Sequence, residues 1–174
     1  MDKNGFIDYM KNWLNSKFNL LESIFALTFL LAITLKSSGV HNMAIVILVA
    51  INLLTLLYIF NSSLMSRDDN FNGTIIFINK IVFYSLAISL VGILFTLFGW
   101  PNADQFLLMG LISNGIFLIF VLVKMSNKND FSFNERYLIR MLLILSVVIS
   151  LKFVPKSQLV QWKIIAKPQV IQMK

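Results

Sequence analysis

Two long apolar runs joined by a short break constrain this chain more than any other feature. The runs extend over Ile81–Phe98 and Gln105–Val123, and between them stand the turn residues Gly99, Trp100, Pro101 and Asn102. A helix needs about 20 apolar residues to cross a bilayer. Backbone polar groups in lipid must be satisfied within the segment, which favours helices. The pattern predicts a transmembrane helical hairpin whose turn is anchored at the membrane surface by its tryptophan.

Composition extends this interpretation to the whole chain. Of the 174 residues, 57% are hydrophobic and only 13% are charged, whereas a soluble domain has about 25% charged residues. We therefore expect one all-α polytopic membrane domain over residues 1–174. The net charge of +7 is typical of basic loops facing anionic lipid headgroups, and we expect no nucleic acid partner. The absence of cysteine excludes disulfides and thiolate metal sites.

Five spans account for the apolar runs. We predict them at residues 18–35, 42–60, 74–98, 104–123 and 137–154. Residues 1–17 place Phe6, Met10, Trp13 and Leu14 at helical spacing, which predicts an amphipathic helix lying in the membrane interface. Residues 155–174 form a basic tail.

The distribution of basic residues predicts the orientation. With five spans, nine lysines and arginines lie in or near the N-terminus and the two long polar loops: Lys3, Lys11, Lys17, Arg67, Lys80, Lys124, Lys128, Arg136 and Arg140. The opposite side holds Lys36 and the five lysines that follow residue 151. Because cytoplasmic loops carry the excess of Lys and Arg, we expect a cytoplasmic N-terminus and a multi-pass protein of a bacterial inner membrane.

A shift of 62 residues aligns the first predicted hairpin with the second. Ser23 then falls on Ser85, Thr34 on Thr96 and Asn52 on Asn114. Two hairpins of the same orientation would form a parallel repeat, related by an axis along the membrane normal.

Three ionisable residues lie within predicted spans, namely Glu22, Lys80 and Arg140. Charges inside a membrane often mark an ion or proton path. All three, however, lie within about two turns of the predicted cytoplasmic ends, and none is near the midplane. We therefore favour a structural role, in which Lys80 and Arg140 extend to the headgroups and Glu22 pairs with one of them or reaches water.

Asn52 and Asn114 lie near the middles of their spans. A side-chain amide in hydrocarbon needs a partner, and an interhelical hydrogen bond is worth about 1 kcal/mol. We favour helix adhesion over substrate binding for both. Small residues should let the two arms of the central hairpin approach closely: Ser85, Ser89, Gly92, Gly110, Ser113 and Gly115.

No catalytic pattern stands out. His41 is the single histidine, and a lone histidine without a nearby acid is a poor metal ligand set. The chain has no glycine-rich phosphate loop and no HExxH motif. We expect no cofactor, no metal site and no enzymatic activity.

The stretch Phe98-Gly-Trp-Pro-Asn-Ala-Asp-Gln-Phe-Leu-Leu-Met-Gly-Leu111 resembles a hairpin of the GldL family of gliding-motility and type IX secretion motor proteins. That family has a His-Trp-Pro-Gly turn, then an apolar run with Gly-Leu and a Thr-Glu pair whose acid is implicated in proton-driven torque. Here Gly99 and Asn102 replace the outer residues of the turn, and Ser113 and Asn114 stand at the Thr-Glu positions. The resemblance covers one hairpin. It implies a related hairpin and a bacterial background, and the loss of the acid argues against a motor.

These observations lead to one main functional hypothesis and one alternative. The main hypothesis is a non-enzymatic accessory or scaffold subunit of a membrane complex, with lipid and other membrane subunits, or further copies of itself, as partners. The alternative is a small transporter or channel that uses the polar residues between the hairpins.

Overall fold

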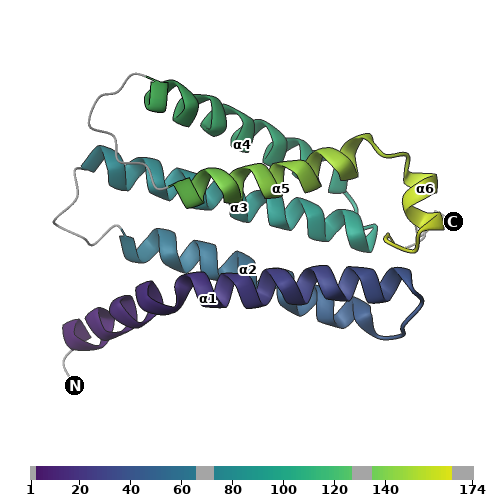
Figure 1. Cartoon of the computed structure of the whole chain (residues 1–174), viewed down its shortest axis with the longest axis horizontal. Coiled ribbons are helices and arrows are strands. Elements are labelled where there is room, and N and C mark those ends of the chain that lie inside the picture. The colour runs from purple at the N-terminus through teal and green to yellow at the C-terminus, as the bar shows by residue number, and fades with distance from the viewer. Residues whose placement is uncertain (1–2, 66–72, 127–134, 166–174) are drawn as a thin grey trace, which may run out of the picture.

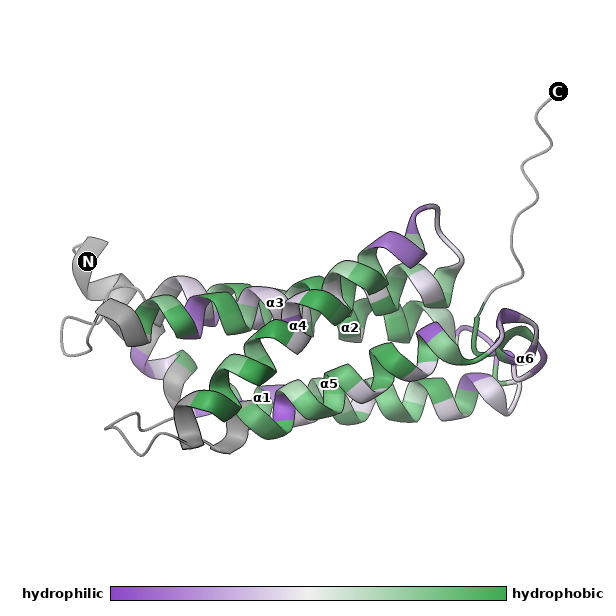
Figure 2. Ribbon diagram, turned by 90° about the horizontal axis from the view of Figure 1, so that it is seen from above, coloured by the Kyte–Doolittle hydropathy of each residue, from purple (hydrophilic) through white to green (hydrophobic). Residues whose placement is uncertain are grey.

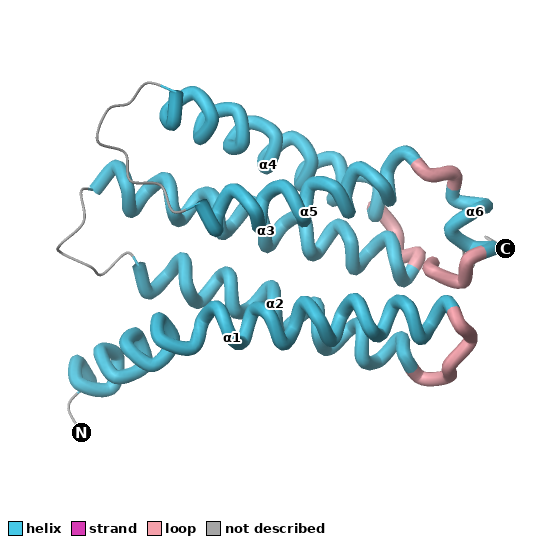
Figure 3. The backbone as a smooth tube through the Cα atoms, viewed as in Figure 1, coloured by secondary structure: helices cyan, strands magenta, loops and turns pink. Residues whose placement is uncertain are grey.

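The structure is a computed structural model that describes residues 3–65, 73–126 and 135–165, and these residues form helices and short turns. Five long helices are followed by one short one (Figures 1 and 3): α1 (Lys3–Ser37), α2 (Met43–Met65), α3 (Gly73–Phe98), α4 (Ala103–Ser126), α5 (Glu135–Phe153) and α6 (Lys156–Gln161). The all-α prediction is confirmed for this part of the chain.

Helices α1 to α5 alternate in direction, so that α1, α3 and α5 point the same way (Figure 1). α3 lies at the centre of the bundle because it packs against α2, α4 and α5, while α1 packs against α2. The core follows from this arrangement. Side chains of α3 that are almost completely buried include Val82, Phe83, Leu86, Ile93 and Leu97.

Four of the described helices are long and apolar enough to cross a membrane, over Ser16–Ser37, Met43–Ser63, Ile76–Phe98 and Ala103–Val123. They match the first four predicted spans to within a few residues. Hydrophobic residues line the middles of these helices (Figure 2).

Helix α5 occupies the place of the predicted fifth span and lies along the bundle (Figure 1). It does not qualify as a span by composition, because Glu135, Arg136, Arg140 and Lys152 fall within its 19 residues. The count of five spans therefore stays a prediction.

The boundary expected between an interfacial helix over residues 1–17 and the first span is not a helix boundary. α1 is continuous over 35 residues, which corresponds to about 52 Å and exceeds the hydrocarbon thickness of about 30 Å. The physical reason is that residues 6–37 contain neither glycine nor proline, so nothing interrupts the helical hydrogen bonds. Of the basic tail, the structure describes residues 155–165.

The turns after α1 and α3 have the same geometry. Gly39 and Gly99 adopt positive φ angles of 90° and 64°. At the second turn the N–H groups of Gly99 and Trp100 donate to the carbonyls of Thr96 and Phe95, and the first turn repeats this pattern. This is the Schellman motif, which requires a left-handed residue and so favours glycine.

The equivalent glycines are 60 residues apart, whereas the predicted repeat has a shift of 62. The register of the turns therefore differs from the register of the predicted repeat, and the repeat stays a prediction. Trp100 of the second turn packs on Phe95 and Phe98, with ring centroids 5.0 Å and 5.4 Å away.

Candidate functional site

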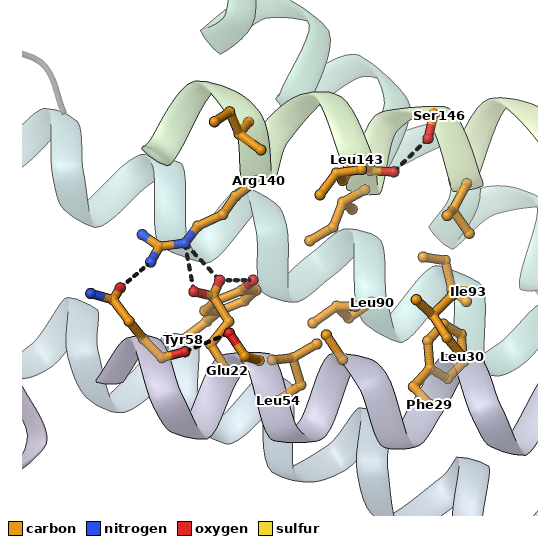
Figure 4. A pocket seen from close by; sticks show the side chains of 16 residues that line it. Glu22, Phe29, Leu30, Leu54, Tyr58, Leu90, Ile93, Arg140, Leu143 and Ser146 are labelled. Atoms are coloured by element: carbon orange, nitrogen blue, oxygen red, sulfur yellow. Dashed lines mark hydrogen bonds and ion pairs between the residues drawn. The ribbon is translucent and has the colours of Figure 1, made fainter. Parts of the chain in front are cut away.

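A groove of about 570 Å³ runs between α1 and α5. We call it the α1–α5 groove; α2 and α3 form its floor with the buried side chains of Leu54, Tyr58, Leu90 and Ile93. Its exposed rim includes Leu30 of α1 and Leu143 of α5. The lining is mostly apolar, with Glu22 and Arg140 together at one end and Ser146 towards the other (Figure 4).

The polar end of the groove is an ion pair between Glu22 and Arg140. The Nε of Arg140 lies 2.6 Å from Oε1 and 2.8 Å from Oε2 of Glu22. Tyr58 donates its hydroxyl to Glu22 Oε1 at 2.7 Å, and Arg140 Nη2 donates to Asn19 Oδ1 at 2.7 Å. Only 14% of the Glu22 side chain and 11% of the Arg140 side chain are exposed. The two opposite charges therefore compensate each other at a place with little exposure to solvent.

Three aromatic rings lie next to the ion pair. Phe18, Tyr58 and Phe83 form a cluster with ring centroids 5.7–6.3 Å apart. The guanidinium carbon of Arg140 lies 4.9 Å from the centroid of Phe18, a distance at which a cation is attracted to the ring. The cluster joins α1, α2 and α3 beneath the charged side chains.

The ion pair is the polar connection between α1 and α5. In the described chain, no Cα atom of α1 lies within 8 Å of a Cα atom of α5. Because the two backbones stay apart, the space between them remains open as the groove. The side chains of Glu22 and Arg140, which are 118 positions apart in the sequence, therefore bridge this open space at one end.

Asn114 occupies a second polar cluster, between α3 and α4, and is completely buried. Its Oδ1 accepts from the hydroxyl of Ser85 at 2.9 Å, and its Nδ2 donates to the hydroxyl of Ser89. Ser89 in turn donates to the carbonyl of Ser85 at 3.0 Å. Every polar atom of these buried side chains has a partner, so the cluster joins the helices and leaves no group for a ligand.

Glycines allow α3 and α4 to approach closely around this cluster. A Cβ atom added at Gly110 would lie 2.6 Å from Ser89 Oγ and 2.8 Å from Ser89 Cα. A Cβ added at Gly92 would lie 2.9 Å from the backbone of Phe106. Gly115, which the sequence placed in the same contact, has open space beside it. The Ser113 hydroxyl donates to Gly110 of its own helix.

Asn52 and Lys80 lie apart from both clusters. Asn52 is exposed on the outer face of α2, and its Nδ2 donates to the Leu48 carbonyl of the same helix at 2.8 Å. The two asparagines that the sequence treated alike therefore have different environments. Lys80 is half-buried on α3, and the structure pairs Glu22 with Arg140 instead.

The opposite end of the bundle carries its own ionic contacts. Asp104, at the start of α4, lies 2.6 Å from Lys156 and 3.8 Å from Lys152, and the side chains of Asp104 and Lys156 are largely exposed. Lys36 donates to the Ile164 carbonyl at 2.9 Å, which ties the segment after α6 to the end of α1. The exposed ion pair of Asp104 and Lys156 contributes little to stability.

No group of histidine, cysteine, aspartate and glutamate within residues 3–65, 73–126 and 135–165 could hold a metal ion. Sequence reasoning singled out Glu22 and Arg140 but missed Asn19 and Tyr58. The spacing of Asn19 and Glu22, three residues apart on one helix face, was the available signal.

Comparisons of the chain with known protein families, with curated proteins and with solved structures found no match. The resemblance of one hairpin to the GldL family therefore stays a prediction.

Proposed function

We propose that this chain is a non-enzymatic scaffold subunit of a membrane complex and that it assembles through the outer face of α2. The observation that carries the proposal is the position of Asn52. Its amide is exposed near the middle of an apolar span of 21 residues. A polar side chain at this depth is unfavourable in lipid, and a neighbouring helix can satisfy it.

The residues around Asn52 form a stripe suited to helix packing. Its large apolar members, all exposed, are Ile45, Val49, Leu56 and Phe60. With Asn52 included, the steps between them are four, three, four and four residues, which place them along one face of α2. An asparagine on such a face can form a hydrogen bond to a neighbouring helix. The stripe therefore combines an apolar packing surface with one polar group that can bond across it.

The partner we propose for this stripe is a second copy of the same chain. The amide carries a donor and an acceptor, so two Asn52 side chains related by a two-fold axis can bond to each other. A two-fold interface brings the same patch of both copies together. The absence of native cysteine makes the contact straightforward to test by introducing single cysteines.

Cysteine substitutions should report the dimer directly. We expect Val49→Cys and Leu56→Cys to form disulfide-linked dimers in membranes, and Met109→Cys, on the exposed face of α4, to remain monomeric. Adding Asn52→Leu should weaken association about fivefold, because an interhelical hydrogen bond of this kind is worth about 1 kcal/mol. SDS gels and single-molecule photobleaching provide the readouts. Monomers throughout would contradict self-association, and cross-links to another protein would identify a different partner.

We also propose five spans with a cytoplasmic N-terminus. Support comes from the direction of α5, which packs against α3 and points the same way as α1 and α3 (Figure 1). The pairing of Arg140 with Glu22 gives this charge an opposite charge within the bundle, as is usual for charged residues inside membranes. Arg67 and Lys128, which contribute to the predicted orientation, lie outside the described residues.

A reporter fused after Lys174 tests this topology. We expect periplasmic alkaline phosphatase to be active at this position and cytoplasmic green fluorescent protein to be dark. Fusions after Met125 should give the opposite pattern, because the chain has then crossed four times. A fluorescent, phosphatase-inactive fusion after Lys174 would mean that α5 does not cross.

The transporter alternative receives no comparable support. Asn52 and Asn114 do not line a common path, because one is exposed on α2 and the other is sealed between α3 and α4. The buried cluster at Asn114 has no polar atom without a partner.

A further inference from the structure

We propose that the end of the bundle at which α1, α3 and α5 finish binds the headgroup phosphate of an anionic membrane phospholipid, and that Lys36 and Lys163 hold this phosphate. We call this part of the surface the lysine end. It consists of three turns, over residues 36–42, 99–104 and 152–165 (Figure 3). It includes no residue of the α2 stripe, so the proposal is independent of the proposed dimer.

The lysine end carries an excess of positive charge. Its three turns contain four lysines and one acidic residue, Asp104. The carboxylate of Asp104 already forms its ion pairs with two of these lysines, Lys152 and Lys156. Four lysines against one aspartate leave an excess of three positive charges on these turns. An anion is therefore the kind of ligand that complements this surface.

The other two lysines, Lys36 and Lys163, each reach the segment that carries the other. Lys36 donates to the carbonyl of Ile164 at 2.9 Å. Lys163 reaches the turn after α1, because a Cβ atom added at Gly39 would lie 3.4 Å from Lys163 Nζ. Within residues 3–65, 73–126 and 135–165, no carboxylate forms an ion pair with either amine. Because an ammonium group has three donors, both amines retain donors for an anion.

The backbone of Lys163 adopts a conformation that favours glycine. Its φ angle is 55°. The N–H groups of Lys163 and Ile164 donate to the carbonyls of Val160 and Leu159, which repeats the Schellman pattern of the turns after α1 and α3. Those two turns have glycine at the left-handed position, whereas lysine adopts it at a steric cost. A residue held in such a conformation points to a requirement for its side chain, here for an amine beside the turn after α1.

The position of the lysine end along the bundle favours a lipid headgroup as the source of the phosphate. Lys36 is the last residue but one of the Ser16–Ser37 span, and lysines at the ends of spans extend to the headgroup layer. Trp100 and Trp162 are exposed at the same end, and tryptophan is enriched at this depth. Basic groups near the membrane surface attract anionic lipids. The lysine end should therefore prefer phosphatidylglycerol to zwitterionic phosphatidylcholine.

Native mass spectrometry of the full-length protein in a neutral detergent tests this preference. Phosphatidylglycerol and phosphatidylcholine are supplied in equal amounts, and the bound lipids are identified by their masses. We expect phosphatidylglycerol to predominate and its excess to decline as salt is added. Lys163→Gly should lower the preference about fivefold, the change that corresponds to about 1 kcal/mol for one lysine. Glycine suits the backbone at this position, so the loss would not come from misfolding.

Matched variants distinguish a site from a general attraction of charge. Lys163→Arg keeps the charge and should keep the preference. Lys17→Gln removes the charge of an exposed lysine near the opposite end of the same span and should leave the preference unchanged. Equal binding of the two lipids, or equal losses in Lys17→Gln and Lys163→Gly, would overturn the proposal. Displacement of phosphatidylglycerol by an equal concentration of inorganic phosphate would also overturn it, because the site would then bind a free anion.

Discussion

Replacing Glu22 with glutamine should destabilise the bundle by about 3 kcal/mol, because it removes the negative charge that lies 2.6–2.8 Å from the largely buried guanidinium of Arg140. The side chain of Arg140 is 11% exposed. Glutamine retains the shape and a hydrogen-bond acceptor for Tyr58, so the loss reports mainly the missing negative charge. Unfolding in bicelles, followed by circular dichroism, measures the change.

Two further variants separate this effect from a general disturbance of α1. Glu22→Gln combined with Arg140→Met removes both charges and should recover most of the loss, because an apolar pair can replace a buried ion pair at little cost. Asp104→Asn breaks an ionic contact whose side chains are 54% and 65% exposed, and it should change stability by less than about 1 kcal/mol. If Glu22→Gln were no more harmful than Asp104→Asn, the ion pair would not be important for the bundle.

Gly110→Ala should destabilise the contact between α3 and α4 by about 1–3 kcal/mol, the range for overpacking a close interface. The new Cβ would meet a backbone atom, Ser89 Cα, at 2.8 Å, so the helices themselves would have to separate. Their separation would also stretch the hydrogen bonds of Asn114 to Ser85 and Ser89. The same unfolding measurement applies.

Gly115→Ala is the matched control for this change. It lies on the same helix, but nothing lies within 4 Å of an added Cβ. Alanine has the higher helix propensity by about 1 kcal/mol, so this variant should be as stable as the parent or slightly more so. Equal destabilisation by both variants would show that the effect comes from α4 alone and not from its contact with α3.

The helices could be predicted from the sequence because each apolar run is long enough to form a helix and ends at turn residues. Gly39 and Gly99 end two of the helices with positive φ angles, and glycine is the residue that a sequence reader expects there. α5 was harder to interpret. Its four charged residues weigh against a span in isolation, and the pairing of Arg140 with Glu22 appears only in the folded bundle.

The candidate site was less predictable because it depends on which helix faces pack against each other in the folded bundle. The sequence offered both Lys80 and Arg140 as partners for Glu22, and only the packing of α5 beside the groove selects Arg140. Asn52 and Asn114 were treated alike for the same reason. A local signal was available, since Asn114 follows the small residue Gly110 by one turn, whereas Asn52 lies between Val49 and Leu56 on a stripe of large side chains.

The distance in sequence between Glu22 and Arg140 has a consequence for biosynthesis. The two residues are separated by 118 positions, so α1 leaves the ribosome long before α5 has been synthesised. Until α5 arrives, the carboxylate of α1 stands in the membrane without its guanidinium partner. The contact between α1 and α5 can therefore form only after α2 to α4 have been synthesised, and a chain truncated after α4 would keep the Glu22 carboxylate without Arg140.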